Sequence, residues 1–586
     1  MDNLYPRPDK TPEVVQNSTP SAPPVDPAAA PAGIPAAPYT PQEPAYAPPA
    51  APYAPPAYSY TAPQRPVYYA PAAAPVKRQT ATGRDIVFAI ITAILCILCA
   101  DNYLWGDAGL GATLSTVCLL LTGIFYLGHH AKKVTFYGLL CVLAYFICAV
   151  SLSFTDLGSA KALVIMTMIP LSAAAILEAN DLRTRTGGDF RNIADIFYAV
   201  FALTFGKIGN TFYALFHKKS DAGSVNKRRL GSVILGLLIS LPALLIIIPL
   251  LKSSDVAFTN LMDQFSPKNL SELFGAVILG LCLFILLFGR MLSAPQITRE
   301  KQTQQRDSGA DPTLIVTFLA VISAVYLLYM FSQLSYFFSA FSGLLPKNYT
   351  VAQYARRGFF EMTAVCAINL LIIFLANLIC RKEEGKAPLA VRLLSVFFCI
   401  FSLLLAATSL SKLFLYVQSF GMTRLRITTS VFIVFLAIVF ITVIFRLFFK
   451  KVPYIKVALI AAALLIAFTA FVNVDRVIAK YNIEAYLDGT LDSIDMDTIV
   501  ELESAATTPY VLKLTDDSDR DVARRAKALL TWQADELFEV KGGKIISSRS
   551  ELRDWNLCTA SAEKLLEEHF SEYYITTGSE RHWFWD

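Results

Sequence analysis

Long apolar runs follow one another from Ile86 to Val474, and most of them are separated by short polar stretches. Most runs are close to the roughly 20 residues with which an α-helix crosses a hydrocarbon core about 30 Å thick. Composition agrees, because 55% of the 586 residues are hydrophobic and only 17% are charged, against about 25% charged in ordinary soluble proteins. The pattern predicts an all-α fold, a polytopic transmembrane helix bundle of about 11 spans. The predicted spans are 86–104, 110–127, 134–154, 162–177, 230–251, 273–289, 314–331, 359–380, 393–410, 427–445 and 457–474.

Two segments of this region depart from the simple pattern. The run 162–177 is short and contains Pro170, which membrane helices tolerate when neighbours satisfy the freed carbonyl. The segment 193–216 carries bulky residues from Phe197 to Phe216 at the three-and-four spacing of one helix face. We predict an interfacial helix there. A twelfth span is the alternative, and it would invert the charge bias of the loops that follow.

The two flanks of the bundle differ from it and from each other. Residues 1–83 are rich in Pro, Ala and Tyr, a composition that predicts a disordered tail. Residues 475–586 turn polar and predict a small helical domain outside the membrane, with helices near 475–489, 494–505, 517–538 and 547–574. The chain is therefore divided into a tail at 1–83, a multi-span domain at 84–474 and a helical appendage at 475–586.

The basic residues predict how the bundle is oriented, because Lys and Arg near span ends stay on the cytoplasmic side. With the tail inside, about 26 basic residues fall in inner segments and about 9 in outer loops. We predict a multi-pass protein of the bacterial cytoplasmic membrane, with its N-terminus cytoplasmic and its C-terminus extracytoplasmic. The lipid bilayer is its first predicted partner.

Motifs for catalysis or cofactor binding are missing from the sequence. It has no GxSxG elbow, Walker loop, HExxH helix or dinucleotide fingerprint. His129 and His130 adjoin without the further ligands that zinc requires, and the acidic run from Asp492 to Asp497 lacks the EF-hand pattern. Nine of the ten cysteines fall in apolar runs and Cys558 alone lies in a polar region. We therefore expect no enzymatic activity, no cofactor and no metal, and a net charge of +5 is too small to predict a nucleic-acid partner.

Polar residues at or within the span 359–380 are candidate functional residues, since such groups are costly in hydrocarbon. Arg357 and Glu361 are spaced i and i+4, so they can neutralise each other on one helix face. Asn369 and Asn377 extend a loosely polar side of the same helix. These residues predict either a substrate or ion path, or interhelical hydrogen bonds with an ion pair at the interface.

Arg424 and Arg426 form a second group of candidates, because they lie at the predicted outer face against the general charge bias. Basic residues kept there could bind lipid headgroups, pair with Glu361 or receive the acidic appendage. Our hypothesis is that the appendage docks on this outer basic surface.

Four segments together carry a resemblance to a known family: Ala355–Met362 (ARRGFFEM), Tyr416–Arg426 (YVQSFGMTRLR), Asn473–Asn482 (NVDRVIAKYN) and Arg553–Leu557 (RDWNL). In this order they resemble the bacterial polytopic membrane proteins of the domain-of-unknown-function 4153/4173 group. The resemblance covers roughly Ile86 to the C-terminus and excludes the tail. It implies an envelope protein with many spans and implies no activity, since the family has none established.

Two classes of function remain open on the sequence. The first is a non-enzymatic scaffold or signal-relay protein, with an intracellular tether and an extracytoplasmic helical sensor. Tyrosines between prolines in the tail could dock in the aromatic groove of a protein partner. The second is a transporter or permease that uses the polar side of the span 359–380. An enzyme that acts on lipid ranks third.

Overall fold

The structure, a computed structural model, describes residues 82–130, 135–182, 192–216, 268–297, 310–342, 359–381, 387–449, 452–541, 544–547 and 553–569. The predicted disordered tail, apart from its last two residues, and the predicted span at 230–251 lie outside the described residues.

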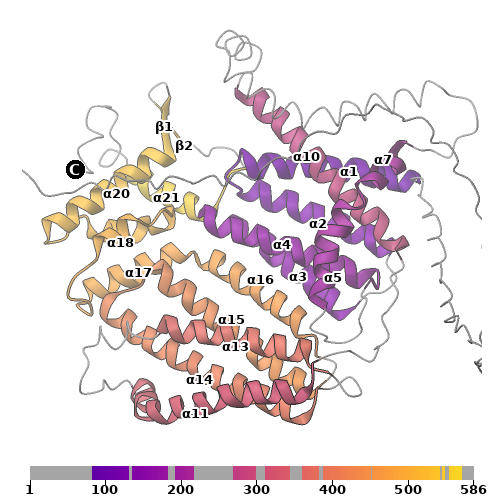
Figure 1. The fold of residues 1–586 in the computed structure, drawn as a ribbon. Coiled ribbons are helices and arrows are strands. Elements are labelled where there is room, and N and C mark those ends of the chain that lie inside the picture. Colours follow the sequence, from indigo (N-terminus) through magenta and orange to yellow (C-terminus); the bar gives the residue numbers. More distant parts are fainter. Residues whose placement is uncertain are drawn as a thin grey trace, which may run out of the picture. The chain divides into compact units, whose positions relative to one another are not determined.

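The described part of the chain contains ten helices that are long and apolar enough to cross a membrane (Figure 1). Each coincides with a predicted span, so these ten predictions are confirmed. The helix with Pro170 is among them and continues through the proline. The ten are α1 (Gly83–Leu104), α2 (Leu110–His130), α3 (Phe136–Ser151), α4 (Gly158–Ala179), α10 (Lys268–Ser293), α11 (Pro312–Ser342), α13 (Phe359–Ile379), α14 (Leu389–Phe420), α15 (Arg424–Phe448) and α16 (Tyr454–Val472).

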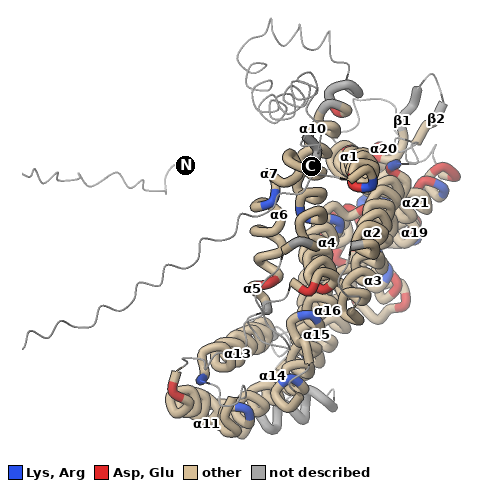
Figure 2. The backbone as a smooth tube through the Cα atoms, turned by 90° about the vertical axis from the view of Figure 1, so that its right-hand side faces the viewer, with Lys and Arg blue, Asp and Glu red and all other residues tan. Residues whose placement is uncertain are grey.

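Side-chain exposure identifies the medium around these helices. Large apolar residues such as Phe125 and Phe331 are 84% and 76% exposed on α2 and α11, and Figure 2 shows that charged residues are sparse along the spans. A surface of this kind is stable only against acyl chains, because in water contiguous apolar surface drives association. The chain is therefore a multi-pass membrane protein.

The spans pack in two groups around separate cores. The first group joins α1 to α2 and α10, and α3 to α4 and α16. The second joins α14 to α11, α13 and α15 around fully buried Phe398 and Phe440. Contacts between α15 and α16 connect the two groups.

Contacts near helix ends show which turns share one end of the bundle. The α1–α2 turn, the 3-10 turn Leu152–Phe154 after α3, and the α14–α15 turn all contact residues that follow α16. At the opposite end Arg84 bonds His129, and backbone bonds pair Ala310 with residues 379 and 381. The start of α1 and the C-terminal appendage therefore lie at opposite ends of the bundle.

The amphipathic segment forms two short helical pieces bent by 45°. The first comprises α5 (Asn192–Phe197), a π-helical turn (Tyr198–Ala202) and α6 (Leu203–Phe205), and the second is α7 (Ile208–Phe216). Buried Leu203 packs in a cluster with the last turns of α4, while Thr211 donates to the carbonyl of Ile285 in α10. Together the two pieces are long and apolar enough to form one bent span, so the interfacial helix and the additional span both remain open.

The appendage folds mainly into short helices around its own core. That core contains Val522, Ala526, Leu529 and Leu530, which lie on one face of a helix and are all buried. The helix predicted at 547–574 begins ten residues later than expected. Before it, residues 538–541 and 544–547 form two antiparallel strands in which Phe538 pairs with Ser547. The elements are α17 (Val474–Leu487), α18 (Met496–Val500), the 3-10 turns Ala505–Thr507 and Leu512–Leu514, α19 (Thr508–Val511), α20 (Arg520–Leu537), β1 (Phe538–Lys541), β2 (Lys544–Ser547) and α21 (Leu557–Glu568).

Candidate functional site at the junction of bundle and appendage

An ion pair between Arg424 and Asp475 connects the start of α15 to the first turn of α17. The Arg424 Nε donates to Oδ1 of Asp475 at 2.7 Å and its Nη2 donates to Oδ2 at 2.6 Å, so the contact is bidentate. The Asp475 side chain is fully buried, whereas that of Arg424 is 41% exposed. Asp475 also accepts the backbone N–H groups of Glu503 and Ser504 at 3.0 and 3.2 Å. One carboxylate therefore holds a bundle helix and a loop of the appendage together.

A second carboxylate, Asp156 in the α3–α4 turn, binds the same loop from the bundle side. Its Oδ2 accepts the backbone N–H of Ala505 at 2.7 Å, and its Oδ1 accepts the Ser504 hydroxyl at 2.5 Å. The Nδ2 of Asn473, between α16 and α17, donates to Asp156 at 3.0 Å and to Ser504 Oγ at 2.8 Å. Residues 503–505 are thus bound by two acids, Asp156 and Asp475, which lie 319 positions apart in the sequence.

The α1–α2 turn makes a backbone-to-backbone contact with the segment before α21. Leu110 N–H donates to the carbonyl of Trp555 at 2.8 Å, and Gly111 N–H to that of Arg553 at 2.9 Å. Gly109 permits this approach, since a Cβ there would lie 2.4 Å from the Trp555 carbonyl oxygen. Charged side chains add to this contact, because Arg553 forms an ion pair with Asp101 at 3.3 Å.

Asn556 and Cys558 continue this contact onto the turn after α3. The Asn556 Nδ2 donates to the Thr155 carbonyl at 2.5 Å, and the Cys558 thiol donates to the Phe154 carbonyl at 3.0 Å. Burial raises the pKa of the Cys558 thiol to about 11. A neutral, shielded thiol reacts slowly, so Cys558 is a natural reporter of this interface.

The predicted basic residues have different roles. Arg424 contacts the appendage as expected, with Glu503 as a further acidic neighbour at 3.8 Å. Arg426 forms no hydrogen bond or ion pair with the described part of the appendage: its Nη1 donates to the carbonyls of Phe420 and Gly421, and its guanidinium lies 4.2 Å from the Tyr416 ring centre. Arg426 thus closes the α14–α15 turn.

The predicted polar side of α13 faces neighbouring helices. Asn369 is fully buried, accepts the Tyr326 hydroxyl at 2.6 Å and donates to Ser402 Oγ at 2.9 Å. Asn377 donates to Ser395 Oγ at 3.4 Å and to the carbonyl one turn back in α13. These contacts have the geometry of interhelical hydrogen bonds, one of the two interpretations of the sequence.

The predicted ion pair at the start of α13 lies partly outside the described residues, because Arg357 does. Glu361 is exposed in the first turn of α13, close enough to Lys412 of α14 for an electrostatic interaction. Among the described residues, no three His, Cys, Asp or Glu side chains come close enough to hold a metal ion.

Sequence reasoning missed Asp156, Asn473 and the glycines of the α1–α2 turn. Asp156 lies in an ordinary loop sequence, and nothing local marks its partner. Asn473 had one signal in the sequence, because it opens the segment Asn473–Asn482 that carries the family resemblance. In the structure its backbone φ is 55°, an uncommon value for a residue other than glycine.

The fold and junction define a class: multi-pass membrane proteins whose helical appendage is bonded to several helix turns at one end of the bundle. Within that class, the chain belongs to the domain-of-unknown-function family DUF4153, whose model matches residues 116–514. The resemblance is thereby confirmed, although the segment Arg553–Leu557 lies beyond the matched residues. No curated protein and no solved structure matches the chain.

Proposed function

We propose that this protein is a non-enzymatic scaffold or signal relay of the bacterial cell envelope, with the appendage as its sensor. The supporting observation is that Asp156 and Asp475 both accept hydrogen bonds from residues 503–505. Through it, the appendage is bonded to the α3–α4 and α14–α15 turns at once. A ligand that binds the appendage in only one of two positions would shift the equilibrium between two arrangements of these turns.

The orientation we propose follows from the basic residues. The excess of Lys and Arg at the end of the bundle opposite the appendage favours that end as cytoplasmic. The appendage then senses the extracytoplasmic side of the cytoplasmic membrane, and the Pro- and Tyr-rich tail meets a protein partner inside the cell.

Transport remains the alternative, and two observations make it the weaker one. Asn369 and Asn377 are engaged in hydrogen bonds with neighbouring helices. An apolar cavity of about 860 Å³ in the bundle is lined by other helices than α13. A flux assay with the reconstituted chain separates the two functions, because Glu361→Gln would abolish flux at unchanged protein yield only if α13 lines a path.

The relay is tested by asking whether the junction controls what the tail contacts. A photo-crosslinking amino acid at Tyr53 in living cells would report contacts of the tail. Asp475→Asn loosens the junction, and Asp488→Asn is the matched control, because Asp488 is an exposed residue at the end of the same helix. We expect the tail crosslinks to change with the first variant and to stay as in the wild type with the second. Unchanged crosslinks in a variant with a demonstrably released appendage would refute the relay.

A further inference from the structure

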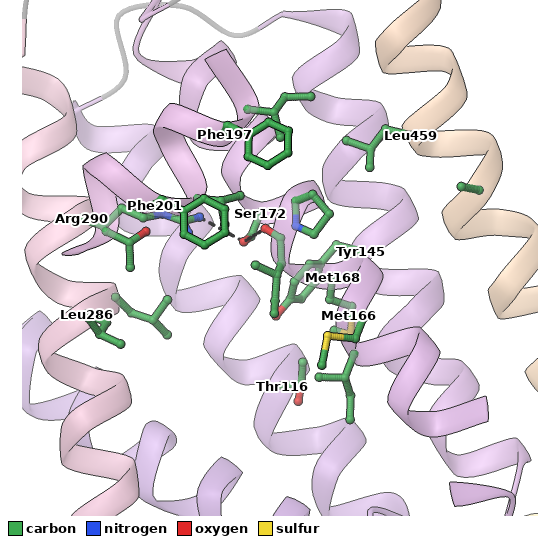
Figure 3. Close-up of a pocket in the computed structure, with 18 of the residues that line it drawn as sticks. Thr116, Tyr145, Met166, Met168, Ser172, Phe197, Phe201, Leu286, Arg290 and Leu459 are labelled. Carbon is green, nitrogen blue, oxygen red and sulfur yellow. Dashed lines mark hydrogen bonds between the residues drawn. The ribbon is translucent and has the colours of Figure 1, made fainter. Parts of the chain in front are cut away.

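A large apolar cavity lies inside the first group of spans, at the amphipathic segment (Figure 3). Its volume is about 860 Å³, within the roughly 300–1,000 Å³ range of small-molecule sites. Side chains from α1 to α6, α10, α15 and α16 line it, and nearly all of this lining is apolar. Met166 of α4 and Phe201 of the π-helical turn are more than half exposed there, so the cavity is open to its surroundings.

One charged side chain, Arg290 of α10, lines this cavity. Only 3% of Arg290 is exposed. Its Nη2 donates to the Ser172 hydroxyl of α4 at 3.0 Å, a bond drawn in Figure 3. Its Nε has no hydrogen-bond partner, and no carboxylate in the described part of the chain forms an ion pair with it.

Two other buried charges of the protein, Glu178 and Asp475, have ionic partners. Glu178, 3% exposed, forms an ion pair with Lys456 and accepts the Thr135 hydroxyl at 2.9 Å. Asp475 has Arg424. A guanidinium in hydrocarbon with a single hydroxyl partner is costly, and intramembrane cations that persist usually meet an anion or a ligand.

The position of Arg290 indicates what that anion is attached to. Arg290 lies three residues before Ser293, the last residue of α10, which is about 5 Å along the axis and close to the headgroup boundary. From there the apolar lining extends along Leu286 and Ile169. The Tyr145 hydroxyl lines the same cavity as a further polar group.

We infer that this cavity binds an anionic phospholipid, with the headgroup phosphate on Arg290 and an acyl chain along the apolar lining. A guanidinium presents parallel N–H donors that match a phosphate. An apolar cavity with one cation at its polar end complements an amphiphile rather than a free ion. The inference is independent of the relay, because it involves none of the junction residues.

The test uses the purified full chain in detergent, and native mass spectrometry to measure retained dioleoyl phosphatidylglycerol. Arg290→Gln removes the cation, and Arg446→Gln is the matched control, an arginine in the last turn of α15 that does not line the cavity. Ile169→Trp fills the cavity and leaves Arg290 in place. It is the second test variant, and it decides the question if Arg290→Gln does not fold.

We expect Arg290→Gln to weaken phosphatidylglycerol binding about tenfold, the loss of one charge-assisted contact, and Arg446→Gln to bind like the wild type. Ile169→Trp should also lose the lipid, and glycerol phosphate alone should not compete. Equal binding by the wild type, Arg290→Gln and Ile169→Trp would overturn the inference. Competition by glycerol phosphate would indicate a free-anion site, and displacement by equimolar oleate a carboxylate site; either result contradicts a phospholipid site.

Discussion

Asp475→Asn is the substitution that tests the junction most sharply. It keeps the shape of the side chain but removes the charge that Arg424 binds and places an N–H donor among groups that already donate, including the backbone N–H groups of Glu503 and Ser504. Breaking a fully buried pair costs about 3–5 kcal/mol. The lower end applies here, because the Arg424 side chain is 41% exposed and stays hydrated when it is left alone. We therefore expect the docked appendage to lose about 3 kcal/mol, or about 100-fold in its docking equilibrium.

Reaction of Cys558 with a charged, membrane-impermeant maleimide measures this loss. Cys558 is buried against the Phe154 carbonyl, so its labelling requires release of the appendage. Eight of the other nine cysteines lie in membrane spans, and Cys380, which directly follows α13, is buried, so a charged reagent does not reach them. The labelling rate should rise about 100-fold in Asp475→Asn and stay unchanged in the control Asp488→Asn. A wild-type rate in Asp475→Asn, at unchanged helix content, would refute the reasoning.

Three further predictions concern the interface and the spans. Burial raises the pKa of Cys558 to about 11, so the thiol of the released appendage ionises at lower pH than the thiol of the docked one. Docking should therefore weaken as the pH rises from about 9 to 11, measured as proteolysis of the appendage. Cys558→Ser should lessen this pH dependence. Gly109→Ala should raise the rate of Cys558 labelling in the wild-type background, since its Cβ would lie 2.4 Å from the Trp555 carbonyl oxygen. An unchanged rate would mean that the turn accommodates the methyl group without weakening the docking of the appendage. Asn369→Ala leaves Tyr326 and Ser402 without a partner and should lower the free energy of unfolding by about 1 kcal/mol in denaturant titration, while a neutral effect would contradict a packing role.

The spans could be predicted from the sequence because hydrocarbon selects long apolar helices whatever their neighbours are. Their ends were less predictable. The helix α14 continues to Phe420, ten residues beyond the predicted end at 410, and Lys412, Leu413 and Val417 of this extension are buried. The hairpin at 538–547 did have a local signal in Gly542–Gly543, a pair typical of two-residue turns.

The candidate sites were harder to predict, because their contacts join distant parts of the chain. Arg424 was identified from its unusual position in the charge pattern, and its contact with an acidic appendage followed from charge alone. Asp156 and Ser504 are 348 positions apart, and no periodicity connects them. Arg290 looks like any cation at the end of a span, and only the packing of α4 and α10 reveals that it is buried.

The side of the membrane reached by each end of the bundle is the most direct test of the central claim. Gly83→Cys and Asp488→Cys, each in a Cys558→Ser background, add one thiol at either end of the bundle. Gly83 has open space around a Cβ, and Asp488 is exposed. With a membrane-impermeant maleimide on intact cells, we predict labelling of Asp488→Cys alone, and of Gly83→Cys only after the cells are permeabilised. Labelling of both positions from the same side would contradict the account.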